Sequence, residues 1–187
     1  MNLITVEKLE EIFFNTENLS GYRANLSGHC IPAAQKEISS LLNYSIAQET
    51  YSKLFDGDGS DRIYLPSKAV DISSVEVWID EERVFGDDTK LDSEDFYCES
   101  WGEVVLYNDY FSIGRKNIKI NYIAGYSEED CPEDLIQAIA NISMFNHSQG
   151  NEFNALTDED FDSTAPKINK LKVTALKLIE PYKRWVI

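Results

Sequence analysis

The aspartates between Asp56 and Asp61 come closer to a metal site than any other residues of this chain. The run reads Asp-Gly-Asp-Gly-Ser-Asp, and carboxylate oxygens are ligands that calcium prefers. An EF-hand loop also requires glycine at its sixth position and glutamate at its twelfth. Those positions hold Asp61 and Ser67. The sequence therefore predicts no metal site, and we interpret the run as a turn that ends a helix.

Histidine and cysteine offer little for nucleophilic or metal chemistry. His29 precedes Cys30, which on paper allows a Cys–His dyad, but we interpret His29 as an ordinary loop residue. The three cysteines, Cys30, Cys98 and Cys131, are odd in number and form no CxxC pair, so we expect neither a disulfide framework nor a zinc site. The motifs GxxxxGK[ST], GxGxxG, HExxH and GxSxG are absent. No catalytic residue and no cofactor are predicted.

Carboxylates and two tryptophans are the remaining groups that could act on a ligand. With 33 acidic residues, carboxylate pairs of the kind glycosidases use can be drawn in many places, and none stands out. We interpret residues 80–82 and 128–130 as solvated turns. Trp78 and Trp101 could line a ligand cleft, but on alternating strands we expect them to pack on a sheet.

The composition indicates a folded, strongly acidic protein. The chain has 187 residues, 43% of them hydrophobic and 12% aromatic, which suits one domain or one domain with an appendage. Its 17 basic and 33 acidic residues give a net charge of −16, a sign that repels DNA phosphates and anionic membranes. There is no signal peptide pattern and no apolar run near the ~18 residues of a membrane span. We therefore expect a soluble protein made in a reducing compartment.

Apolar residues at helical spacing predict three helices outside the C-terminal segment. Thr5 can cap a short first helix. A second helix begins near Pro32 and should extend to about Phe55, whereas residues 15–30 look like a loop. A third begins at Pro132. The apolar stripes of these helices are Leu9, Ile12 and Phe13; Ala34, Ile38, Leu41, Leu42 and Ile46; and Leu135, Ile139, Ile142 and Phe145.

Between residues 62 and 123 the period of the pattern changes from helical to twofold. Apolar and polar residues alternate there, which is typical of half-buried strands. We expect five or six short antiparallel strands. Their segments are residues 62–65, 75–79, 83–85, 96–98, 104–107 and 118–122.

The C-terminal part of the chain differs from the rest in charge. The third helix should end before Gly150, and residues 148–165 form an acidic, irregular linker. Pro166 then opens a last helix with one apolar face. Residues 166–187 contain six basic residues against one acid, whereas residues 1–165 contain 11 basic and 32 acidic residues. Tyr182 and Trp185 are of the types enriched at interface hot spots. This segment either packs on its own domain or docks on a partner chain.

These patterns together predict an α+β fold. Two N-terminal helices and a helix near 132–147 form a helical bundle, an antiparallel β region near 62–123 is inserted into it, and a docking helix follows at the C-terminus. We expect three parts: a body of residues 1–147, an acidic linker of residues 148–165, and a basic docking segment of residues 166–187.

Three stretches of the sequence, in this order and spacing, resemble the tailed-phage head–tail connector proteins, also called adaptor or head-completion proteins. The first stretch is residues 49–55, in which the leading helices end. Residues 63–77 are similar to the family pattern LP-x-x-P-V-x-S-I-x-x-V, and residues 118–139 to V-x-Y-x-A-G-Y followed by V-P-x-x-L-x-x-A-I. The likeness covers roughly residues 3–147. Ala69 replaces a proline, Cys131 replaces a valine, and residues 15–30 look like an insertion.

The resemblance implies a structural, non-enzymatic protein of the virion, located at the head–tail interface and made in the host cytoplasm. Such proteins form a homo-oligomeric ring, usually of twelve copies, below the portal protein. Double-stranded DNA passes through the ring without sequence-specific binding, no membrane is involved, and the ring presents a surface to the next connector or tail protein. The C-terminal segment commonly inserts against the portal. The residues expected to dock there are Lys167, Lys170, Leu171, Leu178, Tyr182, Arg184, Trp185 and Ile187.

The negative charge agrees with this reading, because an acidic wall lets DNA slide rather than stick. We expect deletion of residues 166–187 to abolish attachment to portal-bearing capsids and to leave the body folded. Two other functions stay open. An acidic DNA mimic or inhibitor would be a monomer or dimer whose basic partner is displaced by DNA, although it leaves the basic segment unexplained. A carbohydrate-active enzyme or lectin would have a concave cleft with a carboxyl group of raised pKa.

Overall fold

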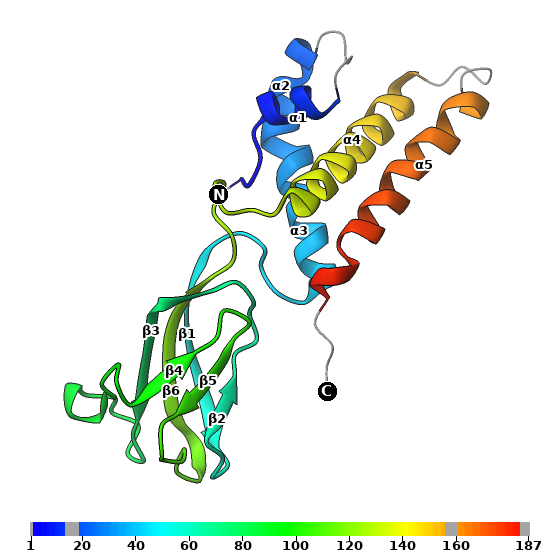
Figure 1. The fold of residues 1–187 in the computed structure, drawn as a ribbon. Helices are drawn as coiled ribbons and strands as arrows, with labels where there is room; N and C mark the ends of the chain where they lie inside the picture. The colour runs from blue at the N-terminus through cyan, green and yellow to red at the C-terminus, as the bar shows by residue number, and fades with distance from the viewer. Residues whose placement is uncertain (1, 14–18, 156–160, 184–187) are drawn as a thin grey trace. The chain divides into compact units, whose positions relative to one another are not determined.

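The chain folds into two units, one helical and one made of β-strands. The computed structural model describes residues 2–13, 19–155 and 161–183. The helical unit combines Met1–Ala47 with Tyr126–Ile187, and the β unit is Gln48–Gly125. In Figure 1 the helices labelled α1 to α5 belong to the helical unit, and the strands labelled β1 to β6 belong to the β unit. The α+β class is confirmed, and the β insertion is longer than the expected residues 62–123.

The helical unit contains five α-helices among its described residues. The Thr5 hydroxyl accepts a hydrogen bond from the Lys8 amide at 3.2 Å, so the expected cap of the first helix is confirmed. Helical turns also occupy residues 19–30, which the sequence indicated as a loop. The elements are α1 (Val6–Ile12), a 3₁₀ turn (Leu19–Tyr22), α2 (Arg23–Asn25), a π-helical turn (Leu26–Cys30), α3 (Ile31–Leu42), α4 (Glu133–Ala155), α5 (Phe161–Leu178) and a 3₁₀ turn (Glu180–Tyr182).

The end of α3 differs from the prediction. Asn43 has a left-handed backbone with φ of 60°, a conformation that commonly terminates helices. The helix expected to reach Phe55 therefore stops at Leu42, and residues Glu49–Gly57 form strand β1. Tyr51 and Phe55 pack against the core of the β unit while Ser52 and Leu54 are exposed. The sequence prediction failed here because this alternation is stabilised by pairing with a distant strand.

The expected linker at residues 148–165 is largely helical in its described part. Helix α4 continues past Gly150 to Ala155, and α5 already begins at Phe161, so that Pro166 lies inside it. A glycine inside a helix costs only about 1 kcal/mol relative to alanine. Gly150 was therefore too weak a signal to end α4.

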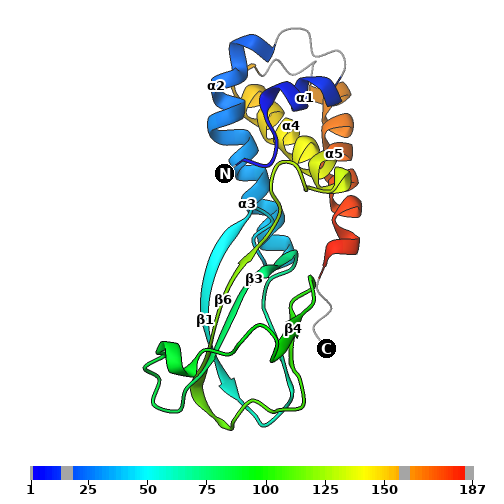
Figure 2. The ribbon, with the colours of Figure 1, turned by 60° about the vertical axis from the view of Figure 1, so that its left-hand side comes forward.

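Helices α3, α4 and α5 lie side by side in the helical unit, as Figures 1 and 2 show. Their apolar faces form one core together with α1. The stripes predicted from the sequence are mostly confirmed, but Leu41 is 41% exposed. Fully buried members of this core are Leu9, Ile31, Ala34, Ile38, Leu135, Ile139, Ile142, Ala175 and Ile179.

The β unit consists of two three-stranded antiparallel sheets. The strand orders are β1-β6-β3 and β2-β5-β4. Their bounds are β1 Glu49–Gly57, β2 Arg62–Tyr64, β3 Val70–Ile79, β4 Phe96–Cys98, β5 Glu103–Leu106 and β6 Gly114–Ala124. One core joins the inner faces of both sheets, and it includes Ile63, Val77, Phe96, Val104, Leu106, Ile118, Ile120 and Tyr122.

The segment after β3 is a loop organised by Asp80. The Asp80 carboxylate accepts hydrogen bonds from the backbone amides of Glu82, Val84 and Phe85 at 2.8, 2.9 and 2.7 Å. These contacts hold Arg83 and Phe85 at φ values of 63° and 56°, which strands do not adopt. The expected turn at residues 80–82 is confirmed, whereas the expected strand at residues 83–85 is wrong.

Candidate docking surfaces

The described thiols are unsuited to nucleophilic chemistry. Cys30 is buried beside the exposed His29, and burial raises the pKa of its thiol. Burial also raises the pKa values of Cys98 and Cys131 to about 11 each. A reactive cysteine needs a lowered pKa, because the thiolate is the nucleophile. All three cysteines are free, and at neutral pH they are protonated.

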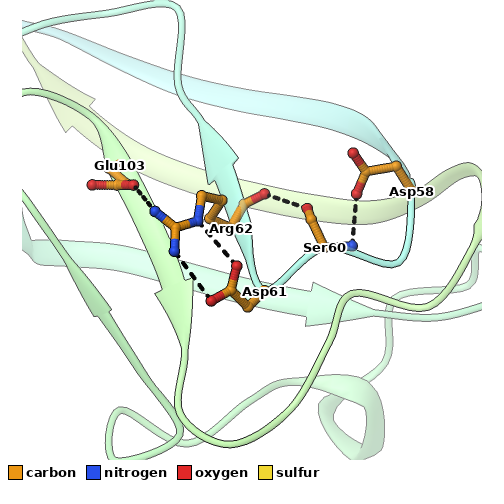
Figure 3. Close-up of polar contacts among 5 residues, drawn as sticks. All are labelled: Asp58, Ser60, Asp61, Arg62 and Glu103. Carbon is orange, nitrogen blue, oxygen red and sulfur yellow. Dashed lines mark hydrogen bonds and ion pairs between the residues drawn. The ribbon is translucent and has the colours of Figure 1, made fainter.

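The aspartate run connects β1 to β2 and does not end a helix, which corrects our interpretation of it. Asp58 accepts a hydrogen bond from the Ser60 amide at 2.9 Å, and Asp61 binds the guanidinium of Arg62, as Figure 3 shows. Asp56 accepts from the Lys116 amide at 2.7 Å. These bonds fix the turn. Nowhere in the described residues do three or more His, Cys, Asp or Glu side chains gather so as to hold a metal ion.

The features required of a carbohydrate-active site are not brought together. Trp78 is only 8% exposed, and the ammonium groups of Lys90 and Lys119 lie 5.2 and 4.9 Å from the centre of its ring. In the part of the chain that the structure describes, every carboxyl group with a displaced pKa is displaced downward. A glycosidase acid requires the opposite displacement. These observations do not support a glycosidase acid, whereas Trp101 is 50% exposed beside Tyr64.

Helix α5 packs on its own helical unit, which is the first of the two alternatives open from the sequence. Ala175 and Ile179 are fully buried in the common core. Leu178 and Tyr182 are half-buried against the same core. The Tyr44 hydroxyl donates a hydrogen bond to the Tyr182 carbonyl at 3.1 Å. The apolar side of this helix is therefore used within the chain.

A lysine of α5 also connects it to both neighbouring helices. The ammonium nitrogen of Lys172 lies 2.9 Å from the Glu37 carboxylate of α3. It also lies 5.0 Å from the centre of the Phe145 ring of α4. These contacts orient α5 so that its opposite side faces away from the bundle.

The side of α5 opposite the core presents a basic stripe, which we call the α5 outer face. It consists of Lys170, Val173, Thr174 and Lys177, all exposed, at the spacing that aligns residues on one helix face. Val173 is 52% exposed. Val173 and Lys177 were absent from the predicted docking set, although their spacing from Lys170 would have identified them.

The predicted docking residues therefore have different positions. Lys170 is exposed and Leu171 is half-buried, whereas Leu178 and Tyr182 contact the core of their own unit. The side chain of Lys167, together with Arg184, Trp185 and Ile187, lies outside the described residues. None of the described helices has the length and apolar character needed to cross a bilayer.

Comparisons with known proteins relate the chain to virion neck components. The family model described as "Head completion protein" matches residues 3–185. A chain from the neck of a native gene transfer agent (GTA) particle, computed with C12 symmetry, has a TM-score of 0.58 at 14% identity, with 90% of this chain and 89% of that chain covered.

Two further solved structures share the fold. A chain from the neck of an empty GTA particle, computed with C6 symmetry, and one from the virion of a native GTA particle each have a TM-score of 0.57 at 15% identity. The matches cover 88% of this chain in both cases, and 80% and 79% of the other chains. No curated protein matches the sequence. The family match spans nearly the whole length, and the chain belongs to the head completion protein family, structural proteins of the virion at the head–tail interface.

Proposed function

We propose that this chain is a non-enzymatic ring subunit of the virion neck, present in twelve copies below the portal. The ring extends the DNA channel and joins the capsid to the tail. The observation that carries the proposal is the head completion match over residues 3–185. The C12 symmetry of the neck that contains a chain of similar fold supports the copy number. Rings of this kind close through one heterologous interface repeated around the axis.

The charge of the chain suits a passage for DNA. A net charge of −16 per copy gives a ring whose field repels the phosphate backbone. DNA then moves through the ring without the counterion release that makes basic surfaces adhere to it. An acidic inhibitor would share this charge, but neither the family nor the basic α5 outer face supports that function.

The proposed contact with the portal is made by the basic C-terminal segment. Leu178 and Tyr182 contribute to the core of the helical unit, so they fix the helix and do not meet the portal. The exposed Lys170, Val173 and Lys177 supply cations and an apolar side chain for an acidic or apolar groove on the portal. Lys167, Leu171, Arg184, Trp185 and Ile187 stay in the proposed docking set.

The structure changes the experiment suggested by the sequence. Deletion of residues 166–187 would remove Ala175 and Ile179 from the core, so the body would not stay folded as expected. A sharper test combines Lys170→Glu with Lys177→Glu, and separately removes residues 184–187. Purified protein is mixed with portal-bearing, DNA-filled heads, and bound protein is counted after sedimentation.

We expect both variants to lose binding to the heads and to keep the melting temperature of the wild type. Lys53→Glu combined with Lys116→Glu, an equal double charge reversal at exposed positions of the β unit, is the control and should bind normally. Binding of the charge-reversed α5 variant at the wild-type level would contradict the docking proposal.

A further inference from the structure

The outer face of the β2-β5-β4 sheet gathers four aromatic side chains, and we call it the aromatic face. Tyr64 pairs with Glu103 and Tyr97 pairs with Val105 across the ladders. Their neighbours Ile63, Phe96, Val104 and Leu106 belong to the core, so alternation along the strands turns the pairs outward. The aromatic face consists of the exposed residues Arg62, Tyr64, Tyr97, Trp101 and Tyr107, which lie around the buried Glu103 and Val105.

The aromatic rings on this face are exposed and occur as two pairs. The ring centres of Tyr64 and Trp101 lie 6.4 Å apart, and those of Tyr97 and Tyr107 lie 5.4 Å apart. Their exposed fractions are 51% for Tyr64, 50% for Trp101, 38% for Tyr97 and 51% for Tyr107. Gathered aromatic surface of this kind marks interaction sites, since Tyr and Trp dominate interface hot spots.

The face offers negative charge and no available cation. Arg62 is the only basic residue in β2, β4 and β5. Its guanidinium donates hydrogen bonds to Asp61 at 3.0 and 3.3 Å and to Glu103 at 3.1 Å (Figure 3). Hydrogen bonds with Asp61 and Tyr64 raise the pKa of Arg62. Asp95 and Glu99, exposed at the two ends of β4, add carboxylates without a described ion pair.

We propose that the aromatic face binds a lysine- and arginine-bearing surface of the protein that follows this chain in the neck. Ring faces attract cations by cation–π contacts, and the carboxylates at the rim steer a basic partner into register. This inference rests on the proposed function, because it assumes a ring between portal and tail. It names the chemistry of the surface that the next component must present.

A second copy of this chain is a poorer occupant. The β unit has 17 acidic and 8 basic residues, so two β units repel one another. The α5 outer face is the surface that we propose contacts the portal. DNA is excluded because the carboxylates repel phosphate. We therefore take the cations that complement the aromatic face to come from a different protein.

Photo-crosslinking in virions tests who occupies the face. Tyr97 is replaced by p-benzoylphenylalanine, which preserves an aromatic ring, and the same probe at the exposed Ile72 of β3 serves as the control. We expect irradiation to join residue 97 to a neck protein other than this chain or the portal, at a peptide containing lysine or arginine. Crosslinks to another copy, crosslinks to the portal, or the absence of any crosslink would overturn the proposal.

Substitutions separate this inference from the proposed function. Virions carrying Tyr64→Ser with Trp101→Ser, or Asp95→Lys with Glu99→Lys, should keep the chain on their heads and lose tail attachment about tenfold or more, as hot-spot loss typically does. The matched control, Ile72→Ser, should assemble normally. Normal tails on heads that carry either double variant would overturn this inference alone. Absence of the wild-type chain from purified heads would instead overturn the proposed function.

Discussion

Asp80 shows how one carboxylate organises a loop through backbone amides. Hydrogen bonds from the Phe85, Glu82 and Val84 amides lower the pKa of this group. A depressed folded-state pKa means that the stabilisation is present above the ordinary aspartate pKa of about 4. It is lost as the pH falls through the lower, folded value.

We therefore predict that acidification releases this loop before the β unit unfolds. The measurement is the protection factor for amide hydrogen exchange at Val84 and Phe85 as a function of pH, which removes the intrinsic pH dependence of the exchange rate. Asp80→Asn should leave this protection factor low at every pH, because the amide side chain carries no charge. Glu81→Gln, at an exposed position of the same loop, should behave like wild type. Identical pH profiles for wild type and Asp80→Asn would show that another group controls the loop.

At the scale of elements, α5 is the helix whose role the sequence left most open. Its inner side carries Ala175 and Ile179 at 0% exposure, and its outer side carries the basic stripe. Because a helix has two sides, intramolecular packing and docking on a partner need not exclude each other. The burial of Ala175 and Ile179 shows that α5 packs on its own unit, and docking of its other side on a partner stays a prediction.

Packing of α5 on its own unit predicts a large difference between two alanine substitutions. Ile179→Ala removes a buried side chain and should lower the free energy of unfolding by about 2–5 kcal/mol. Val173→Ala, 52% exposed on the other side, should change it by no more than about 0.5 kcal/mol. Chemical denaturation of both variants and the wild type measures these changes in the free energy of unfolding. Equal effects of the two changes would mean that α5 is not packed as described.

The sequence predicted elements well where local signals were strong. The Thr5 cap, the start of α4 after Pro132, and the stripe Leu135, Ile139 and Ile142 are confirmed. Alternation likewise located β3, β5 and β6. Each of these elements is predicted from periodicity or capping, and both signals depend only on residues that are close in the sequence.

The wrong predictions have a different cause. The structure of these segments depends on contacts with residues far away in the sequence. Strand β1 exists through its pairing with β6, from Glu49 opposite Ala124 to Phe55 opposite Ile118. The loop after β3 depends on side-chain hydrogen bonds to Asp80. For the candidate docking site, the basic charge of the C-terminal segment was readable, but which residues face outward was not. Leu178 and Tyr182, which were predicted to dock on a partner, are partly buried against their own core.

At the scale of the whole molecule, the two units have separate cores. No residue belongs to both core clusters among the described residues. The ends of the β unit are adjacent, because Glu49 pairs with Ala124. An inserted domain that folds independently has termini close together and a hydrophobic core of its own.

We predict that residues 48–125 expressed alone form a folded domain. The isolated domain should unfold cooperatively and keep slow amide exchange at Ile118 and Ile120, which are fully buried in its core. Val77→Ala, which removes another fully buried side chain, should destabilise the fragment by about 1–3 kcal/mol. An isolated fragment without a cooperative transition would contradict the independence of the β unit.

The most direct test of the proposed ring is a cryo-electron microscopy reconstruction of the neck, from virions in which this chain carries a small label at its N-terminus, away from the proposed docking segment. We predict twelve copies in one closed ring between portal and tail, with the α5 outer face of each copy against the portal. A neck without the label, or with a single copy bound at its side, would contradict the account.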